Sequence, residues 1–216
     1  ELMARLCQKL GRGEQLRALG PRLRSAKELP ETQVNEILAQ VQLEEVRSAG
    51  ERRDVAAANE AWSNLPRATR KLPQAVATYA RALVAAGEAA AAEKLLRDAI
   101  EDKLEPALVR LYGELVLPDA LNPLDRAESW LRKAPEDPEL LAACARLALQ
   151  AELIGKSRSY LEASLARKPS AENSLLYAEL LDQLGEGDRA RTVLRDSVAR
   201  SVGRRPALPR VRLRRR

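Results

Sequence analysis

The stretch YARALVAAGEAAAAEKLLRDAI, from Tyr79 to Ile100, indicates the fold class of this chain. Apolar residues recur at helical intervals on both sides of Gly87, which predicts two amphipathic helices joined by a tight turn. A second copy, YAELLDQLGEGDRARTVLRDSV, runs from Tyr177 to Val198. The chain therefore repeats one helix pair, and a repeat of this length is typical of proteins that stack identical modules.

Four copies of the pattern are expected between residues 72 and 202. A small residue opens each second helix, and its separations of 35, 30 and 33 residues bracket the period of about 34 that is typical of tetratricopeptide repeats. The fold prediction is all-α: a tetratricopeptide-repeat-like, right-handed α-solenoid of stacked antiparallel helix pairs. The small residues are Ala92, Ala127, Ser157 and Ala190, and the pairs are 73–86 with 89–101, 107–117 with 124–133, 138–151 with 155–167, and 171–184 with 188–200.

The domain prediction is one helical-repeat domain over residues 1–202. Residues 1–71 are expected to form degenerate helical pairs and residues 72–202 the four tetratricopeptide-like repeats. Residues 203–216, GRRPALPRVRLRRR, hold seven arginines and no acid, and are expected to be a disordered basic tail. Without them the net charge of +6 falls to −1, so specific nucleic-acid binding is not expected of the folded part.

The residue inventory argues against an enzyme. Histidine is absent, which excludes His-based catalysis and His-ligated metal, and no Gly-rich phosphate loop is present. The two cysteines, Cys7 and Cys144, lie far apart without metal-ligand spacing. The prediction is a non-catalytic protein with no cofactor. No apolar stretch approaches the roughly 18 residues that a membrane span needs.

A concave groove lined by the first helices is the candidate binding site. On the solenoid template one arginine per repeat points into it, and these arginines would grip an acidic peptide or the propionates of a porphyrin. The alternative is solvated arginines paired with neighbouring glutamates. Trp62 and Trp130 are either partner anchors or residues that fill gaps between repeats. The predicted groove residues are Arg81, Arg110 and Arg146, with Glu114, Glu179 and Asp182 on the same surface.

A more specific resemblance is carried by several short stretches. From Trp62 to Gly185 the chain resembles the C-terminal region of the HemY family, the tetratricopeptide proteins associated with haem biosynthesis in proteobacteria. It departs from the family where Ile154 replaces a usual tryptophan. The matching stretches are WSNLP from Trp62, Tyr79-Ala80-Arg81 with Leu83 and Gly87, Leu111-Tyr112-Gly113, AESWL from Ala127, and GKSRSYLEASL from Gly155.

The resemblance implies a scaffold in late haem synthesis at the bacterial inner membrane. The expected partners are ferrochelatase and the preceding protoporphyrinogen or coproporphyrinogen oxidase. The expected anchor is a pair of N-terminal transmembrane helices upstream of Glu1, with this domain on the cytoplasmic side. The basic tail would then bind anionic lipid at the membrane surface. Two alternatives are a haem- or porphyrin-binding carrier and a generic tetratricopeptide peptide-binding adaptor. Haem ligation would need Cys7, Cys144, Met3 or a tyrosine, because no histidine exists.

Overall fold

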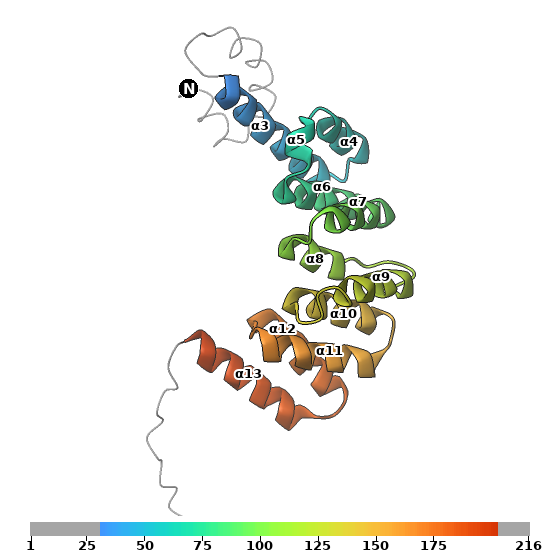
Figure 1. Cartoon of the computed structure of the whole chain (residues 1–216), viewed down its shortest axis with the longest axis vertical. Coiled ribbons are helices and arrows are strands. Elements are labelled where there is room, and N and C mark those ends of the chain that lie inside the picture. Colours follow the sequence, from blue (N-terminus) through green and yellow to red (C-terminus); the bar gives the residue numbers. More distant parts are fainter. Residues whose placement is uncertain (1–30, 203–216) are drawn as a thin grey trace, which may run out of the picture. The chain divides into compact units, whose positions relative to one another are not determined.

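The structure, a computed structural model, describes residues 31–202, and all regular elements in this range are α-helices (Figure 1). Contacts divide the range into two compact bodies, residues 31–118 and 119–202. The first body contains α3 (Glu31–Glu51), α4 (Val55–Ser63), α5 (Arg67–Arg70), α6 (Pro73–Ala85), α7 (Ala89–Asp102) and α8 (Pro106–Gly113). The second contains α9 (Leu121–Leu131), α10 (Pro138–Gln150), α11 (Ile154–Arg167), α12 (Ala171–Gln183) and α13 (Gly187–Ser201).

The all-α fold of stacked antiparallel helix pairs is confirmed within each body. The predicted first, third and fourth repeats correspond to α6–α7, α10–α11 and α12–α13, with ends that differ by at most one residue. The second repeat differs more, because α8 ends at Gly113 rather than at residue 117. Glycine weakens the helix there, and Pro118 opposes its continuation. The helices expected before residue 31 and the tail after residue 202 lie outside the described residues.

One turn geometry recurs in four helix pairs. Two residues after the last residue of each first helix, the backbone has a positive φ angle: Arg53 (56°), Gly87 (88°), Glu152 (59°) and Gly185 (78°). The next residue then donates its backbone N–H to a carbonyl five positions earlier, which is the Schellman arrangement of a helix end. These bonds run from Asp54 to Ala49 (2.9 Å), from Glu88 to Leu83 (2.8 Å), from Leu153 to Ala148 (2.8 Å) and from Glu186 to Leu181 (2.8 Å).

The small residue of each second helix follows five positions after this turn residue. Its burial is nearly complete, which the close approach of two helix backbones requires, and the prediction made for these positions is confirmed. The α3–α4 pair shares both features, so it is a repeat of the same kind, 34 residues before the next one. The small residues are Ala58, Ala92, Ser157 and Ala190, with 0, 0, 0 and 1% exposure, and Ala127 of α9 is equally buried.

Each body has its own apolar core. In the first body, Val46 and Ala49 of α3 pack against α4 and α6, with Trp62 and Tyr79 at the margin. Gly50 allows the closest approach, since a Cβ there would lie 2.7 Å from the Cα of Ala82. The core of the second body is built by Ala145, Leu161, Tyr177, Ala178, Leu180, Leu181 and Ala190.

Three apolar residues that lie at helical spacing in the sequence are exposed. Val116 is 76% exposed because it follows the early end of α8. Leu194 and Val198 of α13 are 36% and 62% exposed. Both lie on the last described helix, and no helix within residues 31–202 packs beyond it on that side.

Candidate functional site

The residue directly after each small residue, called here the linking position, makes a recurring polar contact. In the first body, Asn59 of α4 accepts a hydrogen bond from the Tyr79 hydroxyl of α6 (2.6 Å). Glu93 of α7 likewise accepts one from the Tyr112 hydroxyl of α8 (2.9 Å). Each of these bonds joins the second helix of one pair to the first helix of the next pair. Tyr79 and Tyr112 are therefore packing residues whose hydroxyls are used for this link.

The linking positions of the second body also contact the next pair, but at its second helix or at its turn. Glu128 of α9 accepts hydrogen bonds from Tyr160 and Lys156 of α11, both at 2.9 Å. Arg158 of α11 donates to both carboxylate oxygens of Glu186, at 2.7 and 3.3 Å. Glu186 precedes α13, so this bidentate pair ties α11 to the next helix pair.

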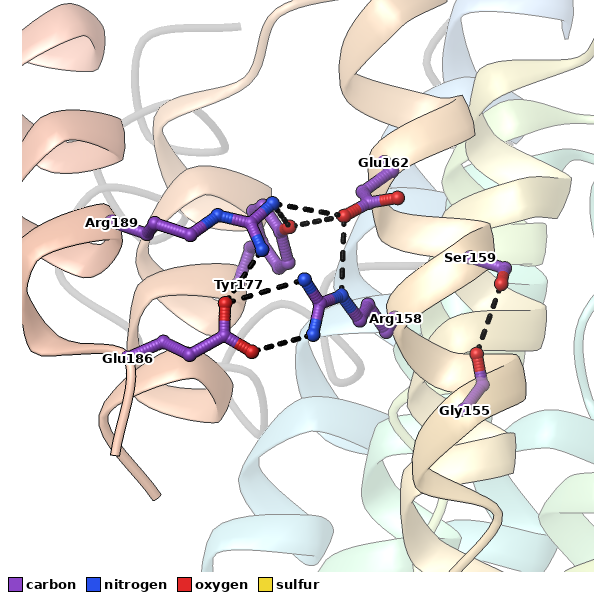
Figure 2. A network of polar contacts seen from close by, with 7 residues as sticks. All are labelled: Gly155, Arg158, Ser159, Glu162, Tyr177, Glu186 and Arg189. Carbon is purple, nitrogen blue, oxygen red and sulfur yellow. Dashed lines mark hydrogen bonds and ion pairs between the residues drawn. The ribbon is translucent and has the colours of Figure 1, made fainter. Parts of the chain in front are cut away.

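Figure 2 shows how Arg158 belongs to a larger network between α11, α12 and α13. Tyr177 of α12 donates to Glu162, and Arg189 of α13 donates to Glu186 (2.6 Å). The hydrogen bond from Tyr177, together with the Arg158 guanidinium, lowers the pKa of Glu162. Arg158 and Arg189 lower the pKa of Glu186 in the same way. The network thus holds both carboxylates ionised and fixes three helices, a structural role.

The linking position of α13 has a different environment. Arg191 is 73% exposed at its side chain, whereas Arg158 is 29% exposed. Arg191 pairs with Asp188, one turn earlier on its own helix. Among the linking positions within residues 31–202, Arg191 thus differs in that its hydrogen bond stays on its own helix alone.

The predicted groove residues of the first body lie at the surface. Arg81 of α6 and Arg110 of α8 are exposed, and the two helices contact each other. Glu114, directly after α8, is also exposed. This body therefore carries two arginines on neighbouring first helices, with one acid close in sequence.

In the second body Glu179 and Asp182 are exposed on α12, but Arg146 is in a different position. Its side chain is 11% exposed, and its Nη2 donates to Glu172 and to Asn173 (3.0 Å). The expectation of an open groove arginine is thus corrected: Arg146 ties α10 to α12. The continuous row of three arginines stays a prediction, because Arg81 and Arg110 belong to the other body.

The cysteine that the structure describes is a core residue. Cys144 of α10 has no exposed surface, and burial raises the pKa of its thiol to about 12. A thiol that stays protonated is a poor metal or haem ligand. Cys7, Met3 and the basic tail lie outside the described residues. Within residues 31–202 no group of three metal-ligating side chains is present.

The tryptophans fill gaps between helices, as one of the two interpretations of the sequence proposed. Trp62 of α4 stacks on Tyr79 of α6, with ring centroids 4.4 Å apart and an interplanar angle of 14°. Trp130 of α9 is 6% exposed. Such stacked and buried rings stabilise the packing of successive pairs.

The linking positions were not identified from the sequence. Their residue types differ (Asn59, Glu93, Glu128, Arg158 and Arg191), so no single letter marks them. What the sequence does offer is their position: each linking position directly follows the small residue of a second helix. For the part of the chain from residue 31 to residue 202, no helix combines the length and hydropathy of a membrane span.

No family model and no curated protein matches the chain. Among solved structures, MamA from Desulfovibrio magneticus RS-1 matches with a TM-score of 0.47 and 11% identity, over 75% of this chain and 96% of that one. A second MamA structure, MSR-1 C2, gives 0.43 and 11%, over 77% and 98%. PilF of Pseudomonas aeruginosa gives 0.47 and 17%, over 93% and 92%. Likeness at this level assigns no function, so the chain's own surfaces must suggest one.

Proposed function

We propose that this chain is a non-catalytic scaffold that binds partner proteins through exposed faces of its first helices. The observation that carries the proposal is the exposure of Arg81 and Arg110 on the contacting helices α6 and α8. Two guanidinium groups on adjacent helices suit acidic segments of a protein, since arginine pairs with carboxylates in a fixed fork. Exposed Glu114 adds a group that favours a partner of mixed charge.

The use of the interior groups supports a scaffold over an enzyme. Tyr112, Tyr160 and Tyr177 donate their hydroxyls to glutamates of other helices, and these contacts hold the pairs together. Cys144 is a protonated core residue. These hydroxyl and thiol groups are thus used for packing, whereas Arg81, Arg110 and Glu114 lie on the surface, where a partner can reach them.

The partners we propose are ferrochelatase and the oxidase that precedes it in haem synthesis. This finer assignment rests on the resemblance of the stretch from Trp62 to Gly185 to the HemY family. An inner-membrane location, through an anchor upstream of Glu1, belongs to the same proposal. It places the scaffold beside enzymes that act on poorly soluble porphyrins.

The test is the binding of purified bacterial ferrochelatase, and separately of each oxidase, measured by biolayer interferometry. The double variant Arg81→Glu, Arg110→Glu is expected to bind about tenfold more weakly, because it reverses two interface charges. Lys94→Glu is the control, since Lys94 is exposed on α7, the second helix of the same pair. Equal binding by wild type and double variant contradicts the arginine surface. Absence of binding to all three enzymes contradicts the haem assignment.

A further inference from the structure

The outer flank of α13 repeats a surface that is covered elsewhere in the same body. On α11 the small residue Ser157 is followed by apolar residues four and eight positions later, Leu161 and Leu165. On α13 the small residue Ala190 is followed at the same spacing by Leu194 and Val198. Because the spacing is identical, the two apolar pairs occupy equivalent angles around their helices.

The covering element is the helix that follows. Leu161 of α11 has no exposed surface. Helix α12, which is the next helix in sequence, contacts α11. In the first body α8 contacts α7, where the equivalent residues Leu96 and Ile100 are 0 and 3% exposed. The equivalent residues on α13, Leu194 and Val198, are 36% and 62% exposed, and Val202, one turn further, is 68% exposed. The open flank therefore has the shape of a site for one more helix.

The charges of α13 decide which kind of helix fits. Arg191 and Arg195 lie on the same flank as Leu194 and Val198, and both are exposed. Arginine only donates hydrogen bonds, so its partner must be an acceptor, ideally a carboxylate. The equivalent residue on α11, Arg158, donates hydrogen bonds to Glu186 of the next pair.

The sequence of α13 and of the segment after it is also basic. Residues 187–202 carry four arginines and two aspartates, a net charge of +2, and residues 203–216 add seven arginines in sequence. A basic helix would be repelled here, and a second copy of α13 would bring the same net charge. Charge complementarity therefore favours an acidic occupant.

We propose that the flank of α13 formed by Leu194, Val198 and Val202, with Arg191 and Arg195, binds an acidic amphipathic helix of a partner protein. The bound helix lies on α13 as α12 lies on α11. Its apolar side covers the three aliphatic residues, and its carboxylates form ion pairs with the two arginines. This surface is separate from the arginines of α6 and α8, so it stands or falls independently of the scaffold's haem partners.

The chain itself supplies a probe of the right chemistry. Residues 170–185, SAENSLLYAELLDQLG, form the helix that covers α11, and they carry three acids and no basic residue. An acetylated, fluorescein-labelled peptide of this sequence is titrated with the whole chain, and fluorescence anisotropy is measured. Saturable binding is expected. A second peptide with Glu172→Gln, Glu179→Gln and Asp182→Asn is expected to bind about tenfold more weakly.

Variants of the chain locate the bound peptide. Arg191→Glu with Arg195→Glu is expected to weaken binding about tenfold, and Leu194→Asp with Val198→Asp to remove it. Arg200→Glu is the matched control, because Arg200 lies about 160° around the helix from Val198. Circular dichroism of each variant checks that the helices are retained.

Three results would overturn the proposal. The first is no binding of the acidic peptide at about 1 mM, which corresponds to less than about 4 kcal/mol of affinity. The second is equal weakening by Arg200→Glu, which would assign binding to general charge. The third is concentration-dependent dimerisation of the chain that Leu194→Asp abolishes, which would assign this flank to a second copy.

Discussion

Helices α10 and α13 contrast both in their composition and in their surroundings. Nine of the thirteen residues of α10 are buried, whereas Ala190 is the one buried residue among the fifteen of α13. Helix α10 contacts α9 and α11 and is tied to α12 through Arg146, whereas α13 packs mainly on α12. In stacked pairs, the burial of a helix thus follows both its apolar content and the number of helices around it. On α13, Leu194 and Val198 are exposed, and no helix within residues 31–202 covers them.

Thiol reactivity provides the largest test of this contrast. In a Cys7→Ser background, Cys144 is expected to react with a thiol reagent at least ~10³-fold more slowly than a cysteine placed on α13 by Val198→Cys with Cys144→Ser. A buried thiol reacts only after local opening, which costs several kcal/mol here, and its raised pKa slows it further. The rates are measured at pH 8 with Ellman's reagent. Similar rates would show that α10 opens as readily as α13.

A pair of leucine truncations gives the next largest difference. Leu161→Ala is expected to lower the free energy of unfolding by about 2–5 kcal/mol, because it leaves a cavity between α11 and α12. Leu194→Ala, at the equivalent position of α13, is expected to cost less than about 1 kcal/mol. Urea titration followed by circular dichroism measures both. Equal losses would mean that the flank of α13 is covered.

Two glycines extend the comparison of crowded and open positions. Gly50→Ala is expected to lower the free energy of unfolding by about 1–3 kcal/mol, because the new methyl group would collide with Ala82. Gly155→Ala is the control, since nothing lies within 4 Å of its added Cβ. It is expected to be neutral or to stabilise by up to about 1 kcal/mol. A harmless Gly50→Ala would contradict the close approach of α3 and α6.

The smallest expected effect is a change in how the free energy of unfolding depends on pH in the acid range. The folded protein lowers the pKa of Glu162, so this carboxylate stabilises the fold above its unfolded pKa, and the contribution is lost as the pH falls through the folded value. Glu162 is 46% exposed, and the contribution is expected to be below about 1 kcal/mol. Unfolding free energies measured from pH 6 to pH 3 should fall less steeply for Glu162→Gln. The exposed Glu179→Gln serves as control, and a Glu162→Gln curve parallel to the wild type would contradict the link.

The sequence predicted the helix pairs well because their signals are local. Gly87 and Gly185 mark two turns directly, and the small residues mark the second helices. The α3–α4 pair was placed among degenerate pairs, and its Arg53 stands where the first and fourth repeats have glycine. Only the backbone shows that it adopts the same left-handed conformation.

The candidate site was less accessible to sequence reasoning, because it depends on side chains that meet across pairs. The template placed Arg146 in an open groove, but its partner Glu172 lies 26 residues away and engages it. The Arg158–Glu186 pair spans 28 residues in the same way. Helical spacing indicates the face on which such a residue lies, and the neighbouring helix decides its partner.

The recurring left-handed turn also has a consequence for the order of folding. Each helix pair closes its turn with bonds between residues five positions apart, such as Glu186 to Leu181, so one pair needs no distant segment to form. Chains with such short-range contacts fold in microseconds to milliseconds. Pairs are therefore expected to form one by one as they leave the ribosome, and links such as Arg158 to Glu186 close only when the following pair has emerged.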